Sequence, residues 1–547
     1  MKVKTIHIIL YLLMFYTSNG QNLDFCGQQH LTNQWFEKNT TLYNKFIDQV
    51  DIIKKRIKSE YQSSDGKIRS PVKYSIPVVF HILHLGGVEN ISEAQIFDQM
   101  RILNRDYQKF NSDTSLIIPE FKGNIADVGF EFKLAQIDPD GKCTNGIIRH
   151  YTDKTNWDAN RLEDFIYTWP AESYLNFYIV KTINIAPAYS FLPGVGIPPS
   201  ADVVVCQSNL VGSIGTANVA NSRVLTHEVG HWFGLPHIWG ITNAPGVACG
   251  DDFVDDTPIT KGFTVCNPSN SKTCNNSITE NWQNYMDYTP CKLMFTNGQK
   301  EYMYNTILSG INQRDNLISE ENLIKTGIKG NQICTPVVNF NSSKTVICKG
   351  ESARFSNTSN VGNNSFSLDW RFGGGLPNSS SDSIVDVQFL EVGNYEVKLV
   401  LTTPIGKDSL AQVIKVVDGS NGIKPSILYS FDDGKLPNGF IISNPNIDNV
   451  KWEINNSIGA NNSAGAICLK NFGQTNISGN YDFFDTPFFD FSLVDSPVFS
   501  YYYSYAKKNE NQLDSFRIQY STDCGQTWKN LSFVPQTQAM ASNTGGV

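Results

Sequence analysis

The stretch THEVGHWFGLPHIWG, residues 226–240, places three histidines and a glutamate within eleven positions. Residues four apart in a helix lie on one face, so His227 and His231 present two imidazoles to the same point. Gly234 is placed to end the helix, because glycine accepts the left-handed conformation of a C-terminal cap. The chain then turns back and brings His237 to the other two. The spacing H-E-x-x-H-x-x-G-x-x-H therefore predicts a metal site built from three imidazoles.

Glu228 lies one step around the same helix, where its carboxylate reaches a water at the site without being a metal ligand. Three nitrogen ligands and one open position are the donor set of a catalytic zinc ion, Zn2+. Zinc lowers the pKa of water towards ~7 and polarises a carbonyl, while a glutamate passes the proton to the leaving amine. A lone helical histidine is more often a packed residue, but the glycine and third histidine make this pattern specific.

The extended motif resembles that of the metzincin zinc endopeptidases, which carry a methionine in a tight turn beneath the metal. The segment NYMDYTPC, residues 284–291, offers Met286 for that turn. Tyr288 matches the metzincin position whose phenol assists the metal and stabilises the oxyanion of the tetrahedral intermediate. The alternative is that Tyr288 only packs, as one of 23 tyrosines.

Five segments narrow the resemblance to the pappalysin family, specifically its bacterial cytophagalysin-like branch. They are IPVVFHILH, LNRDY, HEVGHWFGLPHIWG, CGDDFVDDTP and NYMDYTPCKLMFTNGQ, within about residues 74–328. The resemblance implies a two-lobed α/β (α+β) metalloprotease domain, with the active-site helix in the upper lobe and the methionine turn in the lower one. It also implies endopeptidase activity on protein or peptide substrates. By the order of the cysteines in the family, it implies the disulfides Cys249–Cys274 and Cys266–Cys291, although spacing alone permits other pairings.

The resemblance further implies structural calcium, Ca2+, near the loop after the third histidine. Four carboxylates there suit a calcium-binding loop, because hard cations prefer oxygen ligands: Asp251, Asp252, Asp255 and Asp256. A solvated acidic loop is an equal alternative. Relatives that cleave at basic residues often have extra acidic residues after the methionine-turn tyrosine, whereas only Thr289 and Pro290 separate Tyr288 from Cys291 here. The sequence therefore does not predict a preference for Arg or Lys.

The N-terminus predicts export and latency. Residues 1–20 have a positive start and an apolar run too short to span a bilayer, which is typical of a secretory signal peptide. Residues 21–69 are expected to form a helical propeptide, with Arg69-Ser70 as an accessible cleavage site. Export makes the eleven cysteines disulfide candidates, and an odd number leaves at least one unpaired. Cys26 is expected to hold the zymogen inactive as a thiolate ligand of zinc; the alternative is a disulfide to Cys143 or Cys206.

Strands are expected at 74–84, 128–137, 174–183 and 202–206, and a helix at 92–110 opening at Ser92. The motif helix is expected to start near Asn221-Ser222, which are both good N-cap residues. These elements place the catalytic domain at 70–330. The next region, 336–418, reads as a β-sandwich similar to a PKD domain, in which Trp370, Phe372, Gly393 and Tyr395 match the usual pattern, and Cys334 and Cys348 are a candidate pair. Residues 426–547 resemble a jelly-roll (MAM-like) β-domain, which is expected to be truncated at residue 547.

The formal net charge of −8 comes without a basic block, which disfavours nucleic acid as a partner. No later segment has the ~18 continuous apolar residues that a membrane helix needs. The function predicted is a secreted, extracellular zinc endopeptidase, with surface or matrix docking through its C-terminal β-domains. The alternative is an adhesion or glycan-binding protein whose metalloprotease fold is incidental; the intact Glu228 argues against it.

Overall fold

The computed structural model describes most of the chain. The signal peptide of residues 1–20 and the bond between residues 69 and 70 lie outside the described residues, so both stay predictions. The described ranges are 26–38, 40–63, 72–241, 244–330, 333–362, 364–418, 422–443, 450–460, 462–470, 482–507, 516–525, 527–534 and 543–544.

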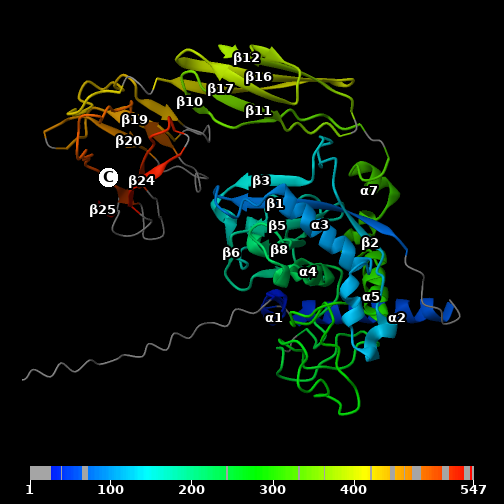
Figure 1. Ribbon diagram of the computed structural model, residues 1–547. Helices are drawn as coiled ribbons and strands as arrows, with labels where there is room; N and C mark the ends of the chain where they lie inside the picture. The colour runs from blue at the N-terminus through cyan, green and yellow to red at the C-terminus, as the bar shows by residue number, and fades with distance from the viewer. Residues whose placement is uncertain are drawn as a thin grey trace, which may run out of the picture.

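A six-stranded sheet forms the centre of the catalytic domain (Figure 1). Its strands are β1 (Tyr74–His84), β2 (Phe130–Leu134), β3 (Ile147–Tyr151), β5 (Leu175–Val180), β7 (Ala188–Ser190) and β8 (Val203–Gln207). Strand β1 pairs in parallel with β2, β3 and β5, and β5 pairs in parallel with β8. Only β7 is antiparallel, at the edge beside β8. The interior of β1 is buried on both faces, as expected for a parallel strand covered by helices.

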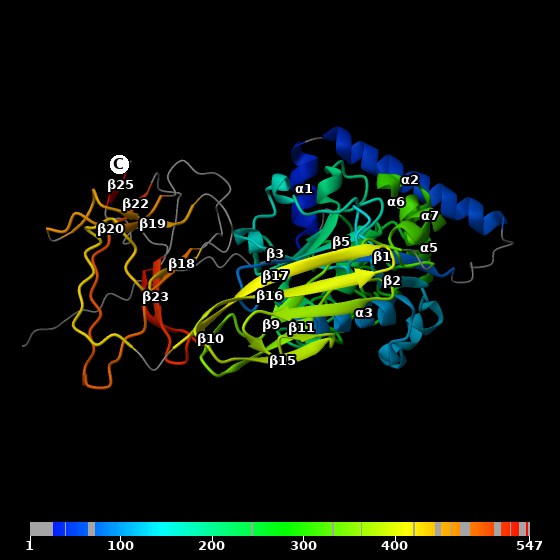
Figure 2. The same ribbon diagram turned by 90° about the horizontal axis from the view of Figure 1, so that it is seen from above.

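Helices cover this sheet and carry the metal-binding motif. They are α3 (Glu93–Tyr107), α4 (Val224–Trp232), α5 (Asn297–Leu308), α6 (Arg314–Leu317) and α7 (Glu320–Lys325). The residues before the expected cleavage site form α1 (Gln28–Lys38) and α2 (Thr40–Ser63). Figure 2 shows α2 running along the outer side of the domain, where it contacts α5. Among the described residues, no helix is both long and apolar enough to cross a bilayer.

Short elements join these parts. Strands β4 (Asn156–Trp157) and β6 (Thr182–Ile183) form a separate pair. Turns of 3-10 helix lie at Ser112–Leu116, Pro119–Asn124, Asp153–Thr155, Leu162–Asp164, Pro199–Ala201, Ser208–Leu210, Val219–Asn221 and Ile311–Gln313.

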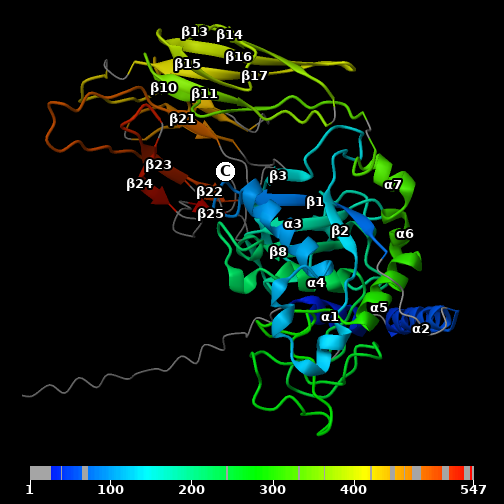
Figure 3. The ribbon, with the colours of Figure 1, turned by 45° about the vertical axis from the view of Figure 1, so that its right-hand side comes forward.

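A β-sandwich follows the catalytic domain, as predicted (Figure 3). One sheet has the order β10-β17-β16-β12-β14 and the other β13-β15-β11-β9. Trp370 and Phe372 are buried between the sheets, because alternate residues of β12 point inward. The strands are β9 (Phe340–Ser342), β10 (Val346–Cys348), β11 (Ser352–Asn357), β12 (Ser367–Phe372), β13 (Gly375–Leu376), β14 (Ser379–Ser380), β15 (Ile384–Phe389), β16 (Gly393–Thr403) and β17 (Gly406–Val417).

The described part of the C-terminal region contains strands that pair two by two, as β18–β21, β19–β20, β22–β25 and β23–β24. They are β18 (Ile441–Ser443), β19 (Trp452–Asn455), β20 (Ala466–Leu469), β21 (Phe483–Asp485), β22 (Ala506–Lys507), β23 (Phe516–Tyr520), β24 (Lys529–Val534) and β25 (Asn543–Thr544). These pairs form a β-rich region, and its jelly-roll topology stays a prediction.

Two local expectations are wrong. Cys334 does not pair with Cys348: the disulfides are Cys143–Cys334 and Cys348–Cys524, which join segments 191 and 176 residues apart. The motif helix begins at Val224, after a 3-10 turn at Val219–Asn221, and its N-cap residue Arg223 makes no side-chain cap.

Candidate metal centre

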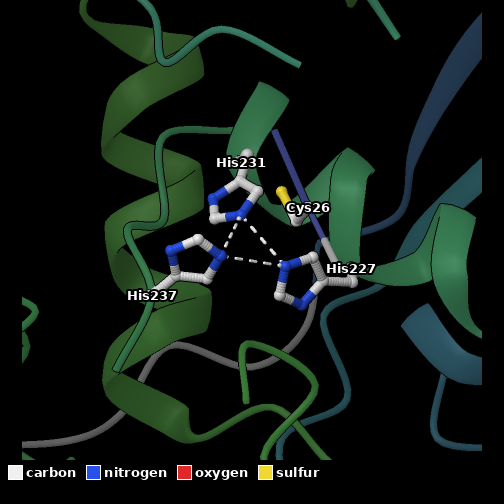
Figure 4. Close-up of side chains that lie close together, drawn as sticks. All are labelled: Cys26, His227, His231 and His237. Atoms are coloured by element: carbon white, nitrogen blue, oxygen red, sulfur yellow. Dashed lines mark hydrogen bonds between the residues drawn. The ribbon is translucent and has the colours of Figure 1, made fainter. Parts of the chain in front are cut away.

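The three motif histidines converge as their spacing predicts. His227 and His231 project from the same face of α4, one helical turn apart. Gly234 then adopts a φ of +98°, and its N–H donates to the carbonyl of His231 at 2.8 Å. This left-handed turn returns the chain toward α4 and places His237 beside the other two rings. The Nε2 atom of His231 lies 3.1 Å from the Nε2 atoms of His227 and His237 (Figure 4). The Nε2 atoms of His227 and His237 lie 3.3 Å apart.

Main-chain carbonyls fix the tautomers of two of these rings. The Nδ1 of His227 donates to the carbonyl of Tyr285, and that of His231 to the carbonyl of Leu235, both at 2.7 Å. With the proton on Nδ1, each neutral ring turns a bare Nε2 lone pair toward the other. Two such lone pairs cannot hydrogen-bond to one another, so their close approach is the arrangement that a shared cation would hold.

The donor set fits zinc. Zinc–nitrogen bonds of about 2.0–2.1 Å in a tetrahedral site place the nitrogens roughly 3.3 Å apart, which agrees with the observed Nε2 separations. All three imidazoles are buried, and burial lowers the pKa of His231 to about 3 and lowers the pKa values of His227 and His237 as well. The rings are therefore neutral near pH 7, which is the form that ligates metals.

Cys26 lies at the same point, although it is 201 residues before His227. Its Sγ is within 4.8 Å of the ligand atoms of all three histidines, and the thiol donates to Oε2 of Glu228 at 3.3 Å. The thiol is buried, which raises its pKa in the absence of a cation. The structure forms no disulfide through Cys26 or Cys206, so neither alternative pairing of Cys26 occurs.

Glu228 is buried beside the histidines without joining their cluster. Burial raises the pKa of Glu228 to about 8, against the opposing effects of the Cys26 thiol and the Lys292 charge. The main chain of Glu228 is held as well, since Ser190 Oγ on β7 donates to its carbonyl at 2.8 Å. This bond ties the helix α4 to the edge strand of the sheet.

The methionine turn lies beneath the metal ligands. Met286 is fully buried, and a Cβ added to Gly230 of α4 would overlap the Met286 sulfur, so the glycine permits the close approach. The ring of Tyr288 stands edge-on to His237, with centroids 4.9 Å apart. Its hydroxyl donates to the carbonyl oxygen of Cys26 at 3.2 Å. Tyr288 therefore points a hydrogen-bond donor into the metal centre.

Two disulfides staple the long loop between His237 and the methionine turn, as Cys249–Cys274 and Cys266–Cys291. These are the pairings that the resemblance implies. The loop is also bonded directly to the turn, because the N–H of Phe263 donates to Oδ1 of Asp287 at 2.9 Å. Its shape is thus coupled to the position of Tyr288, which follows Asp287.

The four aspartates of the expected calcium loop do not converge on one point. Asp252 is buried and its Oδ2 has no hydrogen-bond partner, whereas Asp251 and Asp255 are exposed. Asp256 instead accepts from Thr296 and Gly298 at the start of α5. Among the described residues, only the cysteine–histidine group brings three or more such ligand atoms together. Calcium stays a prediction from the resemblance.

Two networks of hydrogen bonds and ion pairs hold α4 in place. Neither was predicted from the sequence. At the start of α4, Asp106 accepts from Thr226 Oγ1 at 2.9 Å and from Arg223 Nε at 3.3 Å, and the Tyr107 hydroxyl donates to the Thr226 carbonyl. Asp106 and Tyr107 belong to the segment LNRDY. The sequence marked this segment as similar to the pappalysin family but did not predict that these two residues bind the start of α4. At the end of α4, Arg314 donates to the carbonyl of Trp232 and lies 3.8 Å above its ring.

Arg314 is completely buried and pairs with Asp202 at 2.5 Å. The Arg314 guanidinium therefore donates to a carbonyl at the end of α4 and faces the negative end of the helix dipole. We expect Arg314→Met to destabilise the catalytic domain by about 3–5 kcal/mol, because it leaves the buried Asp202 carboxylate without its cationic partner. Calorimetric melting measures the effect.

The matched control for this substitution is Arg354→Met on the β-sandwich, which breaks an ion pair with Asp386 that is exposed to solvent. Exposed pairs contribute little, so the melting temperature should hardly change. Adding Asp202→Asn to Arg314→Met should recover part of the lost stability. Equal melting temperatures for Arg314→Met and the unsubstituted protein would show that the buried Arg314–Asp202 pair does not stabilise the domain.

Comparisons with known proteins identify relatives of this chain. A profile of peptidase family M43, described as pregnancy-associated plasma protein-A, matches residues 160–308. An extracellular metalloprotease from Arthroderma benhamiae is 27% identical over 239 residues, which cover 41% of this chain and 74% of that protein. Mature mirolysin from Tannerella forsythia, solved with a cleaved peptide, is 32% identical over 47% of this chain and 99% of that chain, with a TM-score of 0.43.

A promirolysin mutant from the same organism is 29% identical over 56% of this chain and 100% of that chain, with a TM-score of 0.49. The PKD1 domain of the Vibrio cholerae metalloprotease PrtV is 29% identical over 15% of this chain and 95% of that chain, with a TM-score of 0.13. The profile match contains the three-histidine motif and Met286, and the identity to mature mirolysin extends over nearly all of that chain.

Proposed function

The chain belongs to the pappalysin family of metalloproteases, and on that premise we propose that it is a secreted, zinc-dependent endopeptidase made as a latent zymogen. One observation carries the proposal: three buried imidazoles turn Nε2 atoms toward one point, 3.1–3.3 Å apart, directly beside a buried glutamate. Extracellular metalloproteases among the relatives support secretion. Docking through the C-terminal β-region stays a prediction.

In this proposal, the residues that hold zinc are His227, His231 and His237. The chemistry that zinc supplies when bound is polarisation of the substrate carbonyl and a lower pKa of the attacking water. The Glu228 carboxylate takes the proton from that water and delivers it to the leaving amine.

The edge strand β7 supplies a main-chain template for the substrate. In the latent chain, the N–H of Gly27 donates to the carbonyl of Ala188 at 2.9 Å. An extended peptide bound in its place would form the same kind of bond at a sheet edge. The carbonyl of Cys26, which accepts from the Tyr288 hydroxyl, then stands in for the carbonyl of the scissile bond.

Latency follows from the same contacts. Cys26 places its sulfur among the three imidazoles and its main chain against β7, so the propeptide occupies the position that substrate needs. Thiolate is a strong zinc ligand. We propose that cleavage near Arg69-Ser70 separates this segment from the mature domain and starts activation.

Tyr288→Phe tests the role of the phenol. Removal of the hydroxyl should lower kcat of the mature enzyme by about 10²-fold with little change in KM, because a donor to the developing oxyanion acts mainly in the transition state. Steady-state kinetics on a peptide substrate measure both constants. A change confined to KM would show that Tyr288 only packs against the cleft.

Removal of the metal tests the cofactor. Casein digestion by the activated protein should stop after treatment with a chelator and return after addition of zinc, because the site is formed by the metal and three neutral nitrogens. His237→Ala should lower the bound zinc, since it removes one of the three ligands. Full activity in metal-free protein would refute the proposal.

A further inference from the structure

A second contact of the propeptide lies outside the metal centre, on the apolar face of α2. Phe46, Val50 and Ile53 recur at helical spacing, and each is only 3% exposed. Ile52, on the same helix, is 51% exposed. The helix is therefore amphipathic, and its apolar stripe packs on the protein rather than facing water.

The surface beneath this stripe belongs to the catalytic domain. We call it the clamp face, and its residues are Pro193, Gly234, Tyr302, Thr306 and Ile311. The space left between the stripe and the clamp face is about 10 Å³. A water molecule needs at least roughly 10–15 Å³, so this space holds at most about one water and the contact is closely packed.

Glycines let the catalytic domain approach α2 closely. Gly194 has a φ of +80°, and a Cβ there would collide with the side chain of Gln49. Gly196 has a φ of +81°, and a Cβ there would lie 2.7 Å from Leu42. The loop at Pro193–Gly196 is thus shaped to receive this helix, on a surface that also includes Gly234 of the turn between the metal ligands.

We propose that the clamp face is a binding site for an amphipathic helix, and that residues 40–63 stay bound there after the linker at 64–71 has been cut. This inference rests on the proposed zymogen function but not on Cys26. The stripe and the clamp face both lie outside the linker, so cleavage breaks none of their contacts. Activation then needs a second step, in which the cut propeptide dissociates or is degraded.

Retention of the cut propeptide provides the test. In the full chain, residues 64–71 are exchanged for the recognition sequence of a site-specific protease, in a Cys26→Ala, Glu228→Ala background. This background removes the thiolate contact and prevents self-digestion. After cleavage, native gel filtration and mass spectrometry should find the propeptide eluting with the catalytic domain.

Val50→Asp should lower the retained fraction by about tenfold or more, because it buries a carboxylate in a closely packed apolar contact. Ile52→Asp is the matched control and should retain the propeptide, since that side chain faces solvent. Val50→Ala adds no charge and should lower retention in the same direction by a smaller factor, which guards against misfolding of the aspartate variant.

Loss of the propeptide from the unsubstituted cleaved chain would overturn the inference, as would equal retention in Val50→Asp and Ile52→Asp. The readout needs no proteolytic activity. Failure of the proposed protease function would therefore leave this result unchanged, and failure of retention would leave Glu228-dependent activity standing.

Discussion

Glu228→Gln is expected to lower kcat of the mature enzyme by about 10²–10⁴-fold, the range contributed by a positioned general base. The amide matches the carboxylate in size but cannot accept the proton of the attacking water. Glu228 lies outside the converging cysteine–histidine group, so the variant should bind as much zinc as the unsubstituted protein. Kinetics on a peptide substrate, together with the metal content of the same sample, measure the two effects.

Glu280→Gln is a matched acid-to-amide control for this experiment. Glu280 is also buried, but its carboxylate accepts from Thr260 and Thr273 within the disulfide-stapled loop and faces none of the metal ligands. Its replacement should lower stability more than kcat. If Glu228→Gln retained full activity with zinc bound, the proposed proton transfer would be wrong.

Local patterns predicted the elements that carry the chemistry. Strand β1 has the bounds expected from the apolar run at 74–84, and α3 begins after the predicted cap Ser92, whose side chain accepts from Gln95. The convergence of the histidines follows from helical spacing and one glycine turn. In each case the interactions that decide the structure join residues close in the sequence, within about three turns of helix. The spacing of residue types is therefore enough to predict them.

Contacts between distant segments could not be predicted in this way. Asn221 and Ser222 are good caps, but α4 starts at Val224 because tertiary contacts hold its first turn. Arg223 pairs there with Asp106 and Asp113, more than 100 residues earlier. Spacing likewise could not choose among cysteine pairings. The clamp face combines a loop, a turn and two helical segments, which no local pattern joins.

Cys26→Ala is expected to activate the uncleaved precursor by at least about 100-fold, because it removes an intramolecular ligand whose effective concentration is about millimolar. The Cys26 sulfur lies within 4.8 Å of all three histidine ligand atoms, so its loss leaves a position open to water and substrate. Hydrolysis of a small peptide by the purified precursor, with mass spectrometry to verify that the propeptide is intact, measures the change.

Cys206→Ala separates this switch from a general effect of losing a buried thiol. Cys206 is also unpaired and buried, but its Sγ donates to the carbonyl of Gln207 and is not part of the metal-ligand group. That variant should stay latent. The Cys26→Ala precursor should in turn remain less active than the cleaved enzyme, because Gly27 still pairs with Ala188 on β7. Undiminished latency in Cys26→Ala would mean that main-chain pairing and the clamp face suffice to hold the zymogen inactive, and that the thiol is not its switch.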